Sequence, residues 1–240
     1  MILDFPSYPE FSFSNFVVSQ GSLFAFDTVR EFCSGAPLPY QSLFLYGPAN
    51  LGKTHLLIAL GNHIARHPDN VRALYIHGSD FVRKMNSPGR SEGNKTLTQF
   101  LDVDYFLLDD VEALADRLAA QERLYAIYNE LTAKGKKLAF TGHGPPNRLK
   151  GLEPYLKSRL QWGMTAEIRP IDDATTKKII AKLAQDVGLW IPDKIIDYLL
   201  TRIPRDFLSI KNTVTKLNHE SYIQKKKVSL PLAKAALDLP

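Results

Sequence analysis

The chain has 240 residues, which is enough to bury a sizeable core in one large domain, or in one domain with a small satellite. Its 45% apolar and 23% charged residues are ordinary for a globular protein, and no apolar run approaches the ~20 residues of a membrane helix. The first residues lack the features of a secretory signal, and the single cysteine, Cys33, cannot form an internal disulfide. These features favour a cytoplasmic protein with no membrane contact.

The positive charge lies mainly in the C-terminal third of the chain. Residues 171–240 hold 12 Lys and Arg against 8 Asp and Glu, within a net charge of +5 for the whole chain. Contact with nucleic acid is one explanation and a solvated helical face is the other, because this excess is small for a dedicated DNA-binding surface. The run Lys225–Lys227 has the same two interpretations, a helix end in solvent or a phosphate contact.

Apolar runs of strand length alternate with helical stretches over the first two thirds of the chain. The segment before Ser22 is aromatic and irregular, and Ser22 is a candidate N-cap for a helix through about Ser34. The predicted strands are Leu43–Tyr46, Ala73–His77, Tyr105–Asp110, Lys137–Gly142 and Met164–Ile168. One predicted helix runs from about Lys53 to His67, and a separate long helical stretch follows the third strand and runs to about Lys134. Residues 86–96 are predicted to form a loop. This order predicts an α/β fold with a parallel sheet and helices on both faces.

After Pro170 the strand pattern stops and apolar residues recur at helical spacing. The three groups are Ile179, Leu183 and Val187, then Ile195, Ile196, Leu199 and Leu200, then Phe207, Ile210, Val214 and Leu217. We therefore predict an α/β domain over residues 1–170 and a small all-helical domain over residues 171–240.

A phosphate-binding loop is the most specific motif of the sequence. GPANLGKT, Gly47–Thr54, fits the pattern G-x-x-x-x-G-K-[ST] and lies between a predicted strand and a predicted helix. Gly47 and Gly52 permit the backbone angles and close approach that the loop needs, so that its N–H groups can face phosphate oxygens. Lys53 then neutralises the β- and γ-phosphates, and Thr54 offers a hydroxyl to Mg²⁺. The alternative is a glycine-bearing turn without a ligand.

A pair of carboxylates follows the third predicted strand. Asp109 and Asp110 come at its end, where Asp109 is placed to hold the Mg²⁺ shell and Asp110 to orient or deprotonate an attacking water. Such a pair could also be a turn or a helix cap. Together with the loop, it predicts a nucleoside triphosphatase that uses ATP or ADP and Mg²⁺.

Several blocks of the chain resemble the AAA+ module of the bacterial DnaA family. They are NFVVSQGSLFAF near the start, SLFLYGPANLGKTHLL (Ser42–Leu57), YFLLDDVEAL, FTGHGPPNRLKGLEPYLKSRLQWG (Phe140–Gly163) and PRDFLSIKNTVTKL. They occur in the family's order and cover nearly the whole chain, and the fourth is especially similar to the short DnaA homologues of the Hda group. The resemblance implies a P-loop AAA+ core with a small helical lid.

The resemblance also implies which residues contact the nucleotide. Val17 and Val18 would flank the adenine, and His55, directly after the loop, is included among the nucleotide-binding residues. Asn50 stands where the family usually has glycine. Since asparagine tolerates left-handed backbone angles, we expect binding to survive this departure.

Three further positions carry catalytic roles in the family, in addition to Asp110. Arg159 matches the arginine finger, which reaches the γ-phosphate of a neighbouring subunit's ATP, and Arg205 matches the sensor 2 arginine of the lid. His143 occupies the sensor 1 position, where the family usually has aspartate, and this departure affects hydrolysis or its sensing. Tyr155 replaces an arginine that initiators commonly carry, which weakens an expectation of filament assembly.

The resemblance predicts an interaction switch that regulates replication initiation, with weak ATPase activity that requires a partner subunit. The expected partner is the initiator DnaA, a homo-oligomer is a further option, and no dedicated DNA-binding domain is expected. The sliding clamp of the polymerase is a further candidate partner, but the segment with suitable residue types, Gln20–Phe24, falls where the family begins a helix and more readily explains packing. Trp162 is expected to pack against the arginine-finger block.

Two other classes of function remain as alternatives. A helicase loader or a transposition-helper ATPase would call for an N-terminal partner domain, for which about twenty residues leave little room. A small-molecule kinase could share the P-loop core, but the ordered sensor and finger blocks argue against it. No zinc site is expected, because the chain has a single cysteine and five of its histidines show no tight metal-ligand spacing: His55, His63, His67, His77 and His219.

Overall fold

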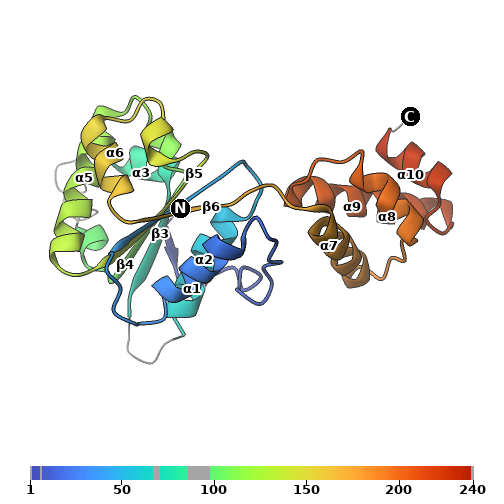
Figure 1. The fold of residues 1–240 in the computed structure, drawn as a ribbon, viewed down its shortest axis with the longest axis horizontal. Coiled ribbons are helices and arrows are strands. Elements are labelled where there is room, and N and C mark those ends of the chain that lie inside the picture. Colours follow the sequence, from blue (N-terminus) through green and yellow to red (C-terminus); the bar gives the residue numbers. More distant parts are fainter. Residues whose placement is uncertain (1, 6, 67–70, 86–97, 239–240) are drawn as a thin grey trace. The chain divides into compact units, whose positions relative to one another are not determined.

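The computed structural model describes residues 2–5, 7–66, 71–85 and 98–238 (Figure 1). The chain divides into two compact units. The first contains Met1–Phe16, Leu23–Pro48 and Gly52–Ile168, and the second contains Val17–Ser22, Ala49–Leu51 and Arg169–Pro240. The predicted loop at residues 86–96 and the end of the predicted helix at His67 lie outside the described residues. In the described part, no helix has the length and apolarity that crossing a bilayer requires.

A six-stranded sheet forms the centre of the first unit, with the order β1-β3-β4-β5-β2-β6. The strands are β1 (Ile2–Asp4), β2 (Ser42–Tyr46), β3 (Ala73–His77), β4 (Tyr105–Asp109), β5 (Lys137–Gly142) and β6 (Met164–Glu167). The last five are mutually parallel, and β1 pairs antiparallel with β3. All five predicted strands are confirmed to within one residue.

Helices cover both faces of this sheet, with α1 and α2 on one face and α3, α5 and α6 on the other (Figure 1). Their bounds, with two short 3-10 helices, are α1 (Leu23–Phe32), α2 (Lys53–Ile64), α3 (Gly78–Met85), η1 (Val111–Leu114), α5 (Leu118–Ala133), η2 (Pro146–Arg148) and α6 (Pro154–Gln161). Because both faces are covered, β4 is buried at every position, as its continuous apolar run requires. The rings of Phe81, Phe100 and Phe106 contact one another in the core on the α3 side.

The expectation that the chain is irregular before Ser22 is wrong for β1. This three-residue strand has no local pattern of its own, and it exists because its backbone pairs with β3, with Ile2 opposite Ile76. The following segment is also fixed by a distant partner. Buried Asn62 of α2 accepts a hydrogen bond from the Ser7 N–H at 2.7 Å and donates to the carbonyls of Ser7 and Phe11.

The second unit is helical in its C-terminal part, as the apolar spacing predicted. Its helices are α7 (Asp173–Asp186), α8 (Asp193–Leu200), α9 (Phe207–Gln224) and α10 (Leu230–Leu237). Carboxylate N-caps begin two of them, since Asp172 accepts a hydrogen bond from the Thr175 N–H and Asp206 from the Ser209 N–H. Val187 and Phe207 were expected on the apolar faces but are exposed, because each lies at the end of its helix.

The helix expected to follow Ser22 does begin at Leu23. However, Leu23 and Phe24 are 50% and 59% exposed, so packing does not explain these two side chains. The apolar groups that face the core begin at the third residue of the helix, where Ala25 is fully buried, as are Val29 and Phe32 further along. The Gln20–Phe24 segment therefore presents apolar surface to solvent.

Candidate nucleotide-binding site

The loop between β2 and α2 can exist only with glycine at two positions. Gly47 has φ 150°, and a Cβ there would lie 2.1 Å from the carbonyl oxygen of Ile168. Gly52 has φ 92°, and a Cβ there would lie 2.6 Å from the ring of Phe16. Gly52 is also the N-cap of α2, so the loop leads directly into a helix N-terminus, which favours anions.

Lys53 directs its ammonium group back into this loop. Its Nζ donates hydrogen bonds of 2.7 Å to the carbonyl oxygens of Gly47 and Pro48, and the residue is buried. Burial lowers the pKa of Lys53, while the carboxylates of Asp109, Glu112 and Asp110 act in the opposite direction. The cation is thus held at the phosphate-binding loop by neutral carbonyls, which phosphate oxygens could replace as acceptors.

Asp109 is held by hydroxyl groups from three different elements. Thr54 and Tyr75 each donate a hydrogen bond of 2.8 Å to its Oδ2, and Thr141 donates to its Oδ1. The Thr54 hydroxyl and the carboxylate therefore converge, and oxygen donors of this kind suit Mg²⁺. Sequence reasoning missed Tyr75 and Thr141, although a lone hydroxyl near the carboxyl end of each apolar strand is a signal that could have found them.

Tyr75 is expected to control how Asp109 serves a metal ion. Burial is the main cause that raises the pKa of Tyr75, so its hydroxyl stays a donor to Asp109. Removing such a supporting hydrogen bond usually costs about tenfold in metal affinity. We expect Tyr75→Phe to weaken Mg²⁺-dependent ATP binding about tenfold, measured by calorimetry, and to leave binding without Mg²⁺ unchanged. Equal losses with and without Mg²⁺ would assign Tyr75 to the fold instead.

Asp110 adopts a left-handed backbone conformation, with φ 59° and ψ 70°, directly after β4. Its N–H donates a 2.8 Å hydrogen bond to the same Thr141 hydroxyl that donates to Asp109. One hydroxyl therefore contacts both the Asp109 carboxylate and the Asp110 backbone. The carboxylate of this left-handed residue lies near two imidazole rings, those of His77 and His143.

Two histidines lie near Asp110. The Ser79 N–H donates to His77 Nδ1, so His77 carries its proton on Nε2, which lies 3.7 Å from Asp110 Oδ2. His143 Nδ1 lies 3.7 Å from both Asp110 Oδ1 and Glu112 Oε1. Glu112 also accepts the His143 backbone N–H, and this bond fixes the start of the loop that carries the histidine.

Two buried carboxylate oxygens in this cluster, Asp110 Oδ1 and Glu112 Oε2, have no hydrogen-bond partner among the described residues. Donor atoms of Asp110, Glu112 and His143 all lie within 4.8 Å of one another. Unsatisfied buried acceptors are costly, so this spot suits a water molecule or another donor.

Arg159 lies on α6 within an aromatic cluster. Its guanidinium carbon is 4.4 Å from the ring centre of Trp162 and 5.7 Å from that of Tyr125, a residue of α5. Trp162 is 72% exposed, and its ring packs against Arg159 of the arginine-finger block, as expected, without entering the core. Its indole forms a platform on the surface that holds the arginine by a cation–π contact.

The other predicted residues have different surroundings. His55 contacts the N-terminal segment, because its Nε2 lies 2.9 Å from the Ser12 carbonyl oxygen and its ring meets two phenylalanine rings edge-on. In the second unit Asn50 has φ 60°, the left-handed conformation expected of it, and its carbonyl accepts the Phe207 N–H at 3.1 Å. Arg205 forms a 2.8 Å ion pair with Asp173, while Val17 and Val18 are half-buried.

Residues 8–167 match the family model of the bacterial DnaA ATPase domain. The chain belongs to this DnaA family. Residues 173–237 match the lid domain of Hda, so the family assignment covers both the sheet-containing part and the helical part. The site therefore lies in a DnaA-type AAA+ ATPase domain followed by a helical lid region.

Similar proteins agree with this assignment. DnaA of Wolinella succinogenes is 31% identical over 233 residues, which is 95% of this chain and 52% of that protein. The chain thus spans about half the length of the curated relatives it matches. Domain III of Thermotoga maritima DnaA has a TM-score of 0.88 at 29% identity, covering 97% of this chain and 98% of that one. AMPPCP-bound DnaA from Aquifex aeolicus has a TM-score of 0.79 at 29% identity, covering 87% and 65%.

Proposed function

We propose that this DnaA-family protein binds ATP or ADP with Mg²⁺ and acts as a nucleotide-dependent switch that regulates replication initiation by contacting the initiator DnaA. The observation that carries the proposal is the position of the Lys53 ammonium inside an intact phosphate-binding loop, beside the paired Thr54 and Asp109 side chains. The AMPPCP-bound DnaA structure of similar fold supports nucleotide binding by this chain.

The proposed division of roles follows the geometry. Lys53 and the loop N–H groups would bind the phosphates, and Thr54 and Asp109 would hold Mg²⁺, which supplies charge neutralisation at the β- and γ-phosphates. Asp110 would orient water, with His143 beside it. Because His143 replaces an acidic residue usual in the family, and the finger would come from another subunit, we expect slow hydrolysis by the isolated protein.

Arg159 is proposed to act on the nucleotide of a neighbouring subunit. Its guanidinium lies over the exposed face of Trp162, and an exposed tryptophan of this size is typical of a protein contact. Arg205 of the lid region and the adenine-flanking Val17 and Val18 would let the bound nucleotide bias the arrangement of the lid. ATP and ADP would then favour different partner-binding states.

The test is the association of this protein with purified initiator in ATP, in ADP and without nucleotide, followed by sedimentation velocity. We expect a complex whose amount depends on the nucleotide, by fivefold or more, which corresponds to the usual coupling of about 1–3 kcal/mol. Equal association in all three conditions would show that the nucleotide does not control binding to the initiator, and the proposed switch would be wrong. Association with the replicative helicase and not with the initiator would favour the helicase-loader alternative.

A further inference from the structure

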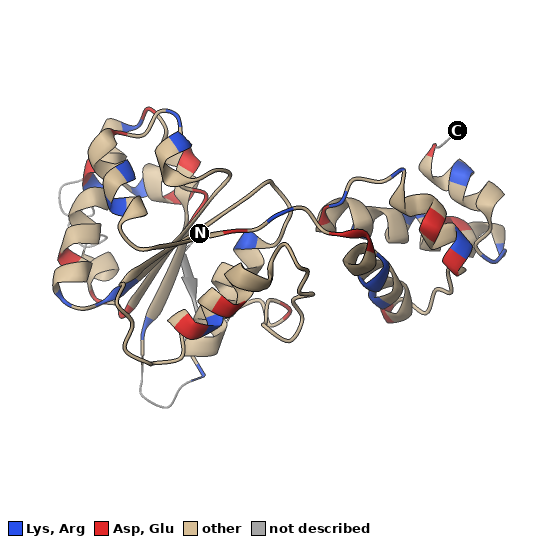
Figure 2. Cartoon of the chain, viewed as in Figure 1, with Lys and Arg blue, Asp and Glu red and all other residues tan. Residues whose placement is uncertain are grey.

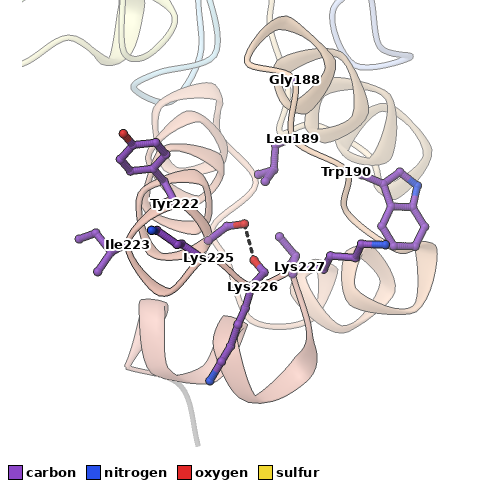
Figure 3. Close-up of a pocket in the computed structure, with 10 residues that line it drawn as sticks. Gly188, Leu189, Trp190, Tyr222, Ile223, Lys225, Lys226 and Lys227 are labelled. Carbon is purple, nitrogen blue, oxygen red and sulfur yellow. Dashed lines mark hydrogen bonds between the residues drawn. The ribbon is translucent and has the colours of Figure 1, made fainter.

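The second unit carries a pocket that uses none of the residues of the nucleotide site. This lid pocket has a volume of about 840 Å³ and forms where the end of α9 approaches the connection between α7 and α8 (Figure 3). Backbone hydrogen bonds fix both of these segments, from the Leu189 N–H to the Ala184 carbonyl at 2.8 Å and from the Lys226 N–H to the Ser221 carbonyl at 3.2 Å. The pocket is therefore formed in advance, which lowers the entropy cost of binding.

Large apolar side chains around the lid pocket are left in solvent. Trp190, Tyr222 and Ile223 are 69%, 83% and 58% exposed, and Trp190 and Tyr222 lie on opposite sides of the pocket in Figure 3. The buried residues of α9 end at Leu217, so its last turn lies beyond the packed part of the helix. Exposed apolar groups that gather in one place mark interaction sites, and tryptophan and tyrosine dominate binding energy at protein interfaces.

Three consecutive lysines stand beside these apolar groups. Lys225–Lys227 are all exposed, with Lys225 on the Tyr222 side and Lys227 on the Trp190 side of Figure 3. Along α7 and α8, basic residues are interspersed with acidic ones (Figure 2), but no Asp or Glu lines the lid pocket. None of the ion pairs among the described residues includes these lysines. Their positive charge is therefore available to an occupant.

We propose that the lid pocket docks an acidic segment of a partner protein, with an apolar side chain between Trp190 and Tyr222 and carboxylates on Lys225–Lys227. The three ammonium groups call for an anionic partner, and the exposed apolar side chains call for an apolar one. An amphipathic acidic helix supplies both, because its apolar anchors recur on one face and its carboxylates flank them. A flat anionic surface could reach the lysines but would not fill a hollow. This docking goes beyond the proposed function and requires neither nucleotide nor initiator.

The experiment is fluorescence anisotropy of a labelled synthetic peptide with the full chain, at low salt and at about 1 M salt. The test peptide has leucine and phenylalanine at positions i, i+3, i+4 and i+7 of a helix and glutamate elsewhere. Two companion peptides replace either the glutamates by glutamine or the apolar residues by serine. We expect the test peptide to bind at least tenfold more tightly than either companion, because each companion loses one of the two kinds of contact.

Variants of the pocket separate the two contributions. Replacing Lys225–Lys227 by alanine should weaken binding of the test peptide about tenfold at low salt, and the difference should shrink at about 1 M salt, where charges are screened beyond about 3 Å. Trp190→Ala should weaken binding about tenfold or more at both salt concentrations, since an aromatic anchor contributes through its burial. All four side chains are exposed, so these variants should unfold at the same temperature as the wild-type protein.

Matched controls come from the same unit. Lys178, Lys182 and Lys211 are exposed and do not line the pocket, so replacing them by alanine removes the same charge. Leu208 is 47% exposed in the first turn of α9, and Leu208→Ala removes apolar surface outside the pocket. Both control variants should retain binding of the test peptide within about twofold.

Three results would overturn the proposal. The first is a lysine control that weakens binding as much as the pocket variant, because the attraction would then be general. The second is a test peptide that does not bind at low salt, or a glutamine companion that binds as tightly. The third is binding of anionic phospholipid vesicles that depends on Trp190 and Lys225–Lys227 when the test peptide does not compete, which would assign the pocket to a membrane surface.

Discussion

Replacing Lys53 by alanine is expected to weaken ATP binding about a hundredfold, because charge-assisted hydrogen bonds to phosphate contribute roughly 1.5–3 kcal/mol each and the Lys53 ammonium can make more than one. The side chain already points into the loop, where it donates to the carbonyls of Gly47 and Pro48. Its position therefore does not have to be created on binding. Calorimetric titration of ATP into the two proteins measures the effect directly.

A second lysine of the same unit provides the control for this experiment. Lys137 is half-buried, donates a 2.8 Å hydrogen bond to the Phe32 carbonyl and has a pKa lowered mainly by burial, so its environment resembles that of Lys53. It begins β5, whereas the loop follows the far end of the parallel strands. We expect Lys137→Ala to affect thermal stability and leave the Kd for ATP unchanged. A normal Kd for Lys53→Ala would refute the proposed phosphate site.

Replacing Arg159 by alanine is expected to abolish any acceleration of hydrolysis of ATP bound to the initiator. Arginine fingers supplied by a partner contribute about 10³–10⁵ in rate because they stabilise charge that develops in the transition state. The measurement follows release of phosphate from radiolabelled ATP on purified initiator, with wild-type protein, with the variant and with neither. ATP binding by the variant itself should be unaffected, since Arg159 contacts Trp162 and Tyr125.

Variants of Trp162 test whether its contact with Arg159 contributes to the acceleration of hydrolysis. We expect Trp162→Ala to reduce the acceleration and Trp162→Phe to keep most of it, because a phenyl ring preserves the cation–π platform. Arg148→Ala removes another exposed arginine of the same unit and should change nothing. If wild-type protein does not accelerate hydrolysis, the regulatory role is wrong. If Arg159 matters and Trp162 does not, only the platform is wrong.

The sequence by itself determined the parallel sheet and the phosphate-binding loop. Both are local in the chain, because a strand buried on two faces is a continuous apolar run and a phosphate loop needs glycines at fixed spacing before a helix. Asp109 and Asp110 were found for the same reason, since they end such a run. The left-handed conformation of Asn50 also followed from its residue type.

The tertiary structure decided what lies around these residues. Tyr75 and Thr141 become partners of Asp109 only because β3 and β5 flank β4, and this strand order is set by long-range packing. The edge strand β1 exists through backbone pairing with β3, for which the sequence of residues 2–4 carries no periodic signal. Exposure is likewise a property of the assembled surface. The residue types alone therefore could not reveal that Trp162 forms an exposed platform for Arg159.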